Sequence, residues 1–232
     1  MFFKVQSINS SNWSPLVESM FKLRKKVFHD QLQWNVNVDG DYEFDQYDNN
    51  DCIYFVWSDA ERSKLYASVR LIPTTKPTLL YDTFRNSFPK SLNLAVPGIW
   101  EATRACLDHS LIKADFPEMT TSYAFGLLTL ATCECAYLDG QHTIVSNYAP
   151  QFNQVYLRAG AMFLEVGRAE GFGDDPVCCG TLNISSSSIR YMQQVLQQPK
   201  PLYEPSASLT AQYITPNGFH AGHVSAGRHF QA

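Results

Sequence analysis

Hydrophobic and polar residues alternate along this chain with two different periods, one typical of strands and the other typical of helices. Strands are predicted over residues 52–58 and 65–73, and the second of them shows a period of two. In the second strand, every other residue from Leu65 to Leu71 is apolar, so Arg70 should leave the sheet on the opposite face. By the same reading, further strands are expected over residues 2–8, 98–107, 142–147, 162–169 and 177–184.

Apolar residues at helical spacing begin after Ser14 and Pro15, which suit an N-cap and a first helical position. Arg24 and Phe28 lie four residues apart and should share one face near the end of this helix, where both can reach one ligand. Further helices are predicted over residues 117–139, 150–159 and 185–197. Helices and strands mixed around one sheet predict a three-layer α/β/α sandwich.

The chain divides into one expected domain, residues 1–197, and a tail, residues 198–232. With 232 residues and 45% hydrophobic content, it can bury one substantial core. From Gln198 onward Pro, Ser, Gly and Ala predominate, so we expect a surface-draped or disordered tail. His220, His223 and His229 lie in this tail without an acidic or cysteine partner, and we predict no metal site there.

Composition excludes several classes of partner. Charged residues make up 17% of the chain and the net charge is −4, which disfavours binding to nucleic acid or to an anionic membrane surface. The sequence contains no export signal and no apolar run long enough to span a bilayer, so we expect a cytoplasmic protein without stable membrane insertion. The six cysteines lack C-x-x-C spacing and are predicted to be reduced core residues rather than metal ligands.

Charged and aromatic residues are interleaved between positions 21 and 104, in the segments FKLRKKVFHDQLQW, DYEFDQYD, YASVRLIPT, YDTF and IWEATR. Part of this region, residues 29–50, is polar and aperiodic, which predicts a long functional loop that orders on binding. Buried charges must be paired or bound to a ligand. The order and spacing of nine residues resemble the motif of the acyl-homoserine-lactone synthase (autoinducer synthase) family: Arg24, Phe28, Trp34, Asp45, Asp48, Arg70, Phe84, Glu101 and Arg104.

This resemblance implies a fold similar to the GNAT acyltransferases and a reaction between S-adenosylmethionine and an acyl thioester. The α-amine of S-adenosylmethionine would attack the thioester to form an amide. Its carboxylate would then displace methylthioadenosine and close a homoserine lactone, a quorum-sensing signal. S-adenosylmethionine is a substrate here, so no cofactor is expected, and the acyl donor is either acyl carrier protein or coenzyme A.

The chemistry of this reaction assigns roles to the motif residues. Glu101 is the first candidate base for the amine, with Asp45 and Asp48 as orienting partners and Arg104 as a further catalytic residue. Trp34 and Phe28 suit the sulfonium, because aromatic faces attract cations. Arg24, Arg70 and Arg104 compete to bind the α-carboxylate. Because this carboxylate must later act as a nucleophile, we predict that at most one of its oxygens is held tightly.

The acyl thioester needs its own cleft. A β-bulge near Thr103 would bring Glu101 and Arg104 to one side and free a backbone N–H to polarise the thioester carbonyl. GNAT-like folds have such a bulge, so we expect the strands 98–107 and 142–147 to splay apart around the pantetheine. Thr143 is a candidate reader of 3-oxo chains. The predicted acyl and pantetheine contacts are Phe84, Trp100, Thr103, Phe125, Thr143 and Val145, with Leu107, Tyr123, Leu128 and Val155 as further pocket candidates.

Two alternatives stay open at this point. One is a GNAT-like N-acyltransferase that acts on another amine, although the glycine-bearing pyrophosphate loop of such enzymes does not follow Leu107. The other is a non-catalytic ligand-binding homologue that kept the pocket and lost the reaction. Release of methylthioadenosine from S-adenosylmethionine would separate the enzyme from the binder.

Overall fold

The computed structural model describes residues 1–9, 15–49, 51–173, 175–205 and 209–213. The strands are β1 (Phe2–Asn9), β2 (Val38–Asp39), β3 (Tyr42–Glu43), β4 (Ile53–Ser58), β5 (Leu65–Pro73), β6 (Ile99–Leu107), β7 (Thr143–Tyr148), β8 (Leu164–Ala169), β9 (Val177–Asn183) and β10 (Leu209–Tyr213). The helices are α1 (Pro15–Arg24), η1 (Lys25–Gln31), α2 (Leu79–Asp82), η2 (Arg85–Ser87), α3 (His109–Asp115), α4 (Thr121–Leu138), α5 (Phe152–Arg158) and α6 (Ser186–Val195).

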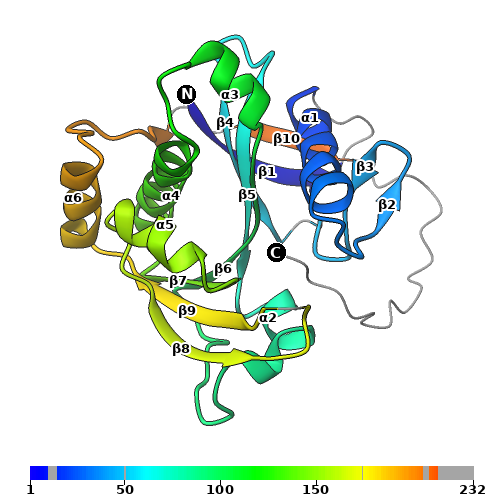
Figure 1. Cartoon of the computed structure of the whole chain (residues 1–232), viewed down its shortest axis with the longest axis vertical. Coiled ribbons are helices and arrows are strands. Elements are labelled where there is room, and N and C mark those ends of the chain that lie inside the picture. Colours follow the sequence, from blue (N-terminus) through cyan, green and yellow to red (C-terminus); the bar gives the residue numbers. More distant parts are fainter. Residues whose placement is uncertain (10–14, 50, 174, 206–208, 214–232) are drawn as a thin grey trace.

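A mixed sheet of eight described strands runs through the centre, in the order β10-β1-β4-β5-β6-β7-β9-β8. Figure 1 shows this sheet with α1 on one side and α4, α5 and α6 on the other. The predicted three-layer α/β/α sandwich is therefore confirmed. Each predicted strand is present, with ends that move by two residues at most.

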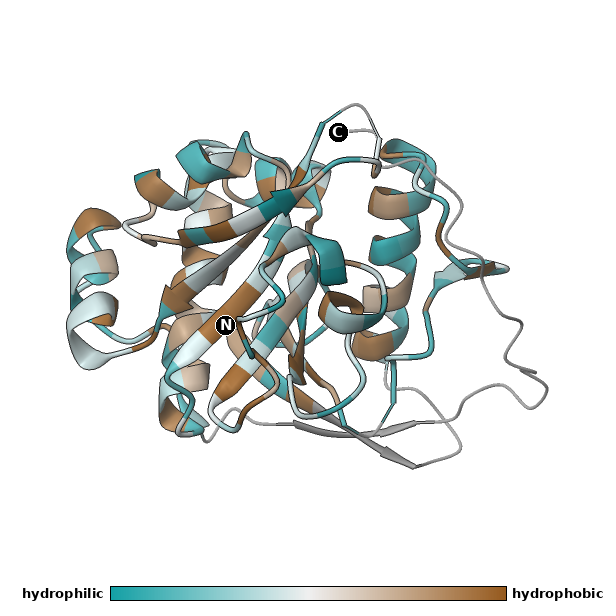
Figure 2. Ribbon diagram, turned by 90° about the horizontal axis from the view of Figure 1, so that it is seen from below, coloured by the Kyte–Doolittle hydropathy of each residue, from teal (hydrophilic) through white to brown (hydrophobic). Residues whose placement is uncertain are grey.

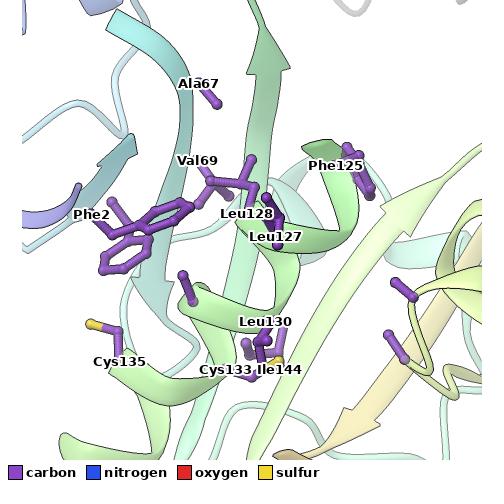
Figure 3. Close-up of a cluster of buried hydrophobic side chains, with 14 of the residues drawn as sticks. Phe2, Ala67, Val69, Phe125, Leu127, Leu128, Leu130, Cys133, Cys135 and Ile144 are labelled. Carbon is purple, nitrogen blue, oxygen red and sulfur yellow. The ribbon is translucent and has the colours of Figure 1, made fainter. Parts of the chain in front are cut away.

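Two separate cores explain the layers, because each strand sends alternate residues to opposite faces. On β4, Phe55 and Trp57 face the core under α4, whereas Tyr54 and Val56 face the core under α1. Figure 2 shows many hydrophobic residues along the central strands, and Figure 3 shows Leu128 and Cys133 of α4 in the buried cluster that also holds strand residues. The sheet is thus covered on both faces.

The predicted alternation of β5 is confirmed for its central residues. Ala67, Val69 and Leu71 face the core under α4, and Arg70 leaves the opposite face. Leu65 is the exception and lies in the core under α1. The register between β4 and β5 shifts beside Ser58, and this irregularity moves Leu65 to the other face.

The helix boundaries differ from the prediction in two places. The helix expected over residues 117–139 is α4, which begins four residues later than predicted because Thr120 caps it by accepting from the Tyr123 N–H. A separate short helix that was not predicted, α3, precedes it and is capped by Asp108, which accepts from the Leu111 N–H. Helix α1 begins at Pro15 as predicted and passes at Arg24 into the π-helix η1. The N-cap expected at Ser14 lies outside the described residues.

The prediction of a draped tail is wrong for part of the segment after Gln198. Tyr203 is buried and packs its ring against Phe55 at a centroid distance of 5.2 Å. The backbone N–H groups of Leu202 and Tyr203 donate to Glu134 of α4 over 2.8 and 3.0 Å. Strand β10 then pairs in parallel with β1 at the sheet edge. The three tail histidines lie outside the described residues.

Strand β6 carries the irregularity that was predicted near Thr103. Arg70 pairs with Thr103 and Ser68 pairs with Cys106, so β6 has one residue more than β5 in this interval. Arg104 has φ = 55°, a left-handed conformation that fits a bulge. On its other side β6 pairs with β7 only from Ile99 to Glu101, after which the ladder of backbone hydrogen bonds between the two strands ends. The predicted bulge and splay are both confirmed.

Candidate active site

Arg24 is the centre of a buried ion-pair network beneath α1. Its Nε donates to Glu43 over 2.6 Å, and its two terminal nitrogens donate to the two oxygens of Asp48 over 2.7 and 2.8 Å. Tyr54 donates its hydroxyl hydrogen to Asp48 over 2.8 Å. Each of these charged side chains is at most 2% exposed, so each needs the partners that it has.

Arg70 and Arg104 extend the network from the sheet. Arg70 donates from Nη1 and Nη2 to Asp45 over 2.5 and 3.0 Å, and from Nε to the hydroxyl of Thr103 over 3.0 Å. Arg104 donates from Nε to Glu43 and from Nη2 to Asp45, both over 3.1 Å. The bulge therefore brings Arg104 to the side of the sheet that Arg70 and Thr103 occupy.

Three guanidinium groups and three carboxylates balance in this network. Burial alone would raise the pKa of Asp48, but the charges of Arg24 and Arg70 outweigh it and hold that pKa well below its ordinary value. Because the six charges cancel, an additional charged group inside the site must bring its own partner. The bonds of Arg104 to the described residues use Nε and Nη2, which leaves Nη1 for a ligand.

Glu43 is the network residue that the sequence interpretation missed. It is fully buried and bridges Arg24 and Arg104 through its two oxygens. A signal was present: in the segment 42–45 apolar and acidic residues alternate, which in an extended chain puts Glu43 on the same side as Asp45. In the structure Tyr42 and Glu43 form the strand β3 of the hairpin β2–β3, within the segment that was expected to be a loop.

Glu101 lies next to the network and makes no ion pair with a described residue. It is fully buried on β6, and neither carboxylate oxygen has a hydrogen bond of good geometry to a described residue, although the backbone N–H groups of Leu79 and Leu80 lie close enough to favour its ionised form. Burial nevertheless raises the pKa of Glu101 from its ordinary 4.5 to about 8, against the opposing charge of Arg70. The carboxyl group is therefore mostly protonated at neutral pH, and a cation bound beside it would favour its ionised form.

Aromatic side chains cover the Arg104 end of the network. The guanidinium carbon of Arg104 lies 5.4 Å from the centre of the Phe28 ring, and Phe28 stacks on Trp34 at 5.0 Å. Phe28 is buried, whereas Trp34 is half-buried and reaches the surface. The structure thus brings together eight of the nine motif residues, since Phe84 lies apart against Phe172.

An apolar cavity of about 40 Å³ lies on the other face of the sheet, between the split strands and α4. Its walls include Val69 of β5, Ala102 of β6 and Leu128 of α4. Past the end of the ladder, the hydroxyl of Ser146 donates to the carbonyl of Ala102 over 3.0 Å and still links β6 to β7.

Few of the predicted acyl contacts line this cavity. Phe125 and the further candidate Leu128 do, and Trp100 belongs to the same core. Val145 faces the opposite side of β7, in the core beside α2, while its neighbours Ile144 and Ser146 line the cavity. Thr143, at the start of β7, shares a hydrogen bond of 2.9 Å with the ring of His142 and is not part of the wall.

The part of the chain that the structure describes contains neither a metal site nor a helix able to span a membrane. No group of three His, Cys, Asp or Glu side chains there could hold a metal ion. All six cysteines are buried free thiols, as predicted. None of the described helices combines the length and the apolar character that crossing a bilayer requires.

Comparison with known proteins agrees with this site. The chain is 33% identical to an acyl-homoserine-lactone synthase of Rhizobium etli over 144 residues, which are 62% of this chain and 66% of the relative. It is 28% identical to an acyl-homoserine-lactone synthase of Agrobacterium fabrum over 174 residues, 74% of this chain and 81% of the relative.

Solved structures agree with the fold. Structures of BjaI, a CoA-dependent acyl-homoserine lactone synthase, with MTA and with SAM and isopentyl-CoA, superpose with a TM-score of 0.75 at 18% identity. The superposition covers 93% of this chain and 95% of BjaI. The family model described as autoinducer synthase matches residues 8–192, which include every residue of the ion-pair network. The chain therefore belongs to the autoinducer synthase family.

Proposed function

We propose that this enzyme makes an N-acyl-homoserine lactone from S-adenosylmethionine and an acyl thioester. The observation that carries the proposal is Glu101, a buried carboxyl group without an ion-pair partner among the described residues, beside a network whose charges already balance. The α-ammonium group of S-adenosylmethionine is a cation that would pair with the ionised form of Glu101. The family to which the chain belongs supports the same reaction.

The bound α-ammonium group favours the ionised form of Glu101, and this carboxylate then accepts a proton from the ammonium group and leaves a neutral amine. A free α-amino group has a pKa of about 7.7–8.0, close to the pKa of about 8 of Glu101. Groups with matched pKa values exchange a proton with little loss of free energy. The neutral amine then attacks the thioester carbonyl, its nitrogen forms the amide bond, and the thiol leaves with the electron pair of the broken C–S bond and a proton.

Arg104 is the guanidinium that we assign to the α-carboxylate. The nitrogens of Arg24 and Arg70 are committed to acidic or hydroxyl partners, whereas Nη1 of Arg104 lies outside such bonds. A single nitrogen holds one oxygen and leaves the other to attack the γ-carbon. That attack closes the lactone and breaks the bond from the γ-carbon to sulfur. The electron pair stays on sulfur, so neutral methylthioadenosine departs.

The sulfonium itself is assigned to Trp34, whose ring is the more exposed of the stacked pair. The acyl chain is assigned to the cavity under α4, which the split between β6 and β7 borders. The thioester is carried by coenzyme A or by acyl carrier protein. Both substrates are made in the cytoplasm, and we propose that the enzyme works there.

The test combines purified protein, S-adenosylmethionine and a panel of acyl donors on both carriers. We expect release of methylthioadenosine together with one acyl-homoserine lactone, measured by chromatography and mass spectrometry. Arg104→Gln should lower turnover by about two orders of magnitude, since it removes the carboxylate contact. Arg168→Gln is the matched control, because Arg168 makes only an exposed ion pair with Glu165. The proposal fails if no donor gives methylthioadenosine.

A further inference from the structure

The cavity under α4 has room for only a short chain. Its volume is about 40 Å³. A buried site needs roughly 10–15 Å³ for each water-sized group, so this volume holds about three or four groups of methylene size. The carbonyl carbon and its neighbour remain at the split between the strands and need no space in the cavity. This reasoning rests on the proposed function, which assigns the cavity to the acyl chain.

One aromatic side chain limits the cavity on the side of α5. Tyr156 is 8% exposed and lines the cavity together with Phe163. The centre of its ring lies 4.3 Å from that of Phe163, 5.4 Å from that of Tyr148 and 5.5 Å from that of Phe125. A ring packed against three others cannot turn aside without losing those contacts.

The remaining walls are held in place differently. Val69 and Ile144 belong to strands that ladders fix on both sides, and Leu128 belongs to α4, which is buried nearly all round. Helix α5 has only seven residues, and Leu157 beside Tyr156 is 53% exposed. Removing the ring of Tyr156 would widen the cavity on the side of α5.

We infer that Tyr156 sets the upper limit of acyl-chain length, and that the preferred donor carries a short aliphatic chain of about five or six carbons. Tyr156 is a specificity-determining residue in this account and takes no part in the chemistry. A longer chain would have to displace its ring, and with it the aromatic contacts that hold α5 against α4.

The experiment compares kcat/KM for six-carbon and ten-carbon donors in the wild-type protein, in Tyr156→Leu and in Phe152→Leu. Wild-type protein should favour the six-carbon donor by about tenfold or more. Tyr156→Leu should raise the ten-carbon to six-carbon ratio by about tenfold. Phe152→Leu is the matched control, because Phe152 contacts Phe125 at 5.8 Å and Tyr156 at 6.5 Å but does not line the cavity, and its ratio should stay that of the wild type.

Two results would overturn the inference: equal use of both donors by the wild-type protein, or an unchanged ratio in a folded Tyr156→Leu protein. If that variant does not fold, Tyr156→Met, which keeps more apolar volume, answers the same question. Calorimetric binding of S-hexyl and S-decyl coenzyme A tests the length limit without turnover. A wild-type protein that binds S-hexyl coenzyme A more tightly yet releases no methylthioadenosine would refute the proposed function and support the length limit.

Discussion

Replacing Glu101 by glutamine should change how the stability of the protein depends on pH. Glu101 has its pKa raised from 4.5 to about 8 by burial. Between these two values the unfolded chain has lost the proton while the folded protein still holds it. The unfolded state then binds fewer protons, so the free energy of unfolding falls as pH rises through this window and levels off above it.

The magnitude follows from the same two values. At about 1.4 kcal/mol per pKa unit, the loss over the whole window is roughly 5 kcal/mol. Between pH 6 and pH 9 the share of this loss is about 2.5 kcal/mol, because part of it has already occurred below pH 6. Glu101→Gln cannot ionise, so this variant should keep the stability that the wild-type protein loses.

Urea unfolding of both proteins at several pH values from 6 to 9 measures the difference. Glu165→Gln serves as the control, because Glu165 is an acid in an exposed ion pair and its pKa is lowered, out of this range. Its curve should run parallel to that of the wild type. If the difference in the free energy of unfolding between Glu101→Gln and the wild type stays constant within about 0.5 kcal/mol from pH 6 to pH 9, Glu101 is not a neutral buried carboxyl group with a raised pKa.

Three more predictions address the network, the tail and the acyl specificity. Glu43→Gln should lower the free energy of unfolding by about 3–5 kcal/mol, since it breaks the buried ion pairs that link Glu43 to two arginines. If urea unfolding shows that this free energy falls by less than about 1 kcal/mol, Glu43 does not link the two arginines as described. Truncation after Gln198 should lower the melting temperature, because it exposes the surface that Tyr203 covers. The loss of this side chain alone should lower the free energy of unfolding by roughly 1.5–3 kcal/mol. If calorimetry gives the same melting temperature for both proteins, the segment after Gln198 is merely draped on the surface. Thr143→Val should leave the ratio of 3-oxo to unsubstituted products, measured by mass spectrometry, unchanged, since Thr143 lies outside the cavity wall. A change in that ratio would show that Thr143 contacts the acyl chain.

Sequence reasoning reached the sheet and most of the network because both depend on local pattern. The alternation along β5 assigns Arg70 to one face, and the three-residue spacing of Glu101 and Arg104 demands an irregular strand if both are to meet. The bulge at Arg104 satisfies that demand. The convergence of Arg24 with Asp48 required the family resemblance, since nothing local relates residues so far apart in the chain.

The expected acyl contacts and the cavity differ where a single residue of register decides the outcome. We expected Thr143 and Val145 to contact the acyl chain, whereas Ile144 and Ser146 line the cavity, because a shift of one residue exchanges the two faces of a strand. Strand β10 was missed since its pairing with β1 depends on residues more than two hundred positions away. The amino-acid composition of the tail describes the segment as a whole, and it does not reveal the short stretch that pairs with β1.

The pairing of β1 with β10 has a consequence for how this protein is made. A ribosome delivers the first strand early, yet its parallel neighbour emerges only when synthesis has reached residue 213. Until then one edge of the sheet and the surface beneath Tyr203 stay open to other chains in the cell. Folding must therefore finish after most of the polypeptide has been synthesised, and chaperones have a defined interval in which to act.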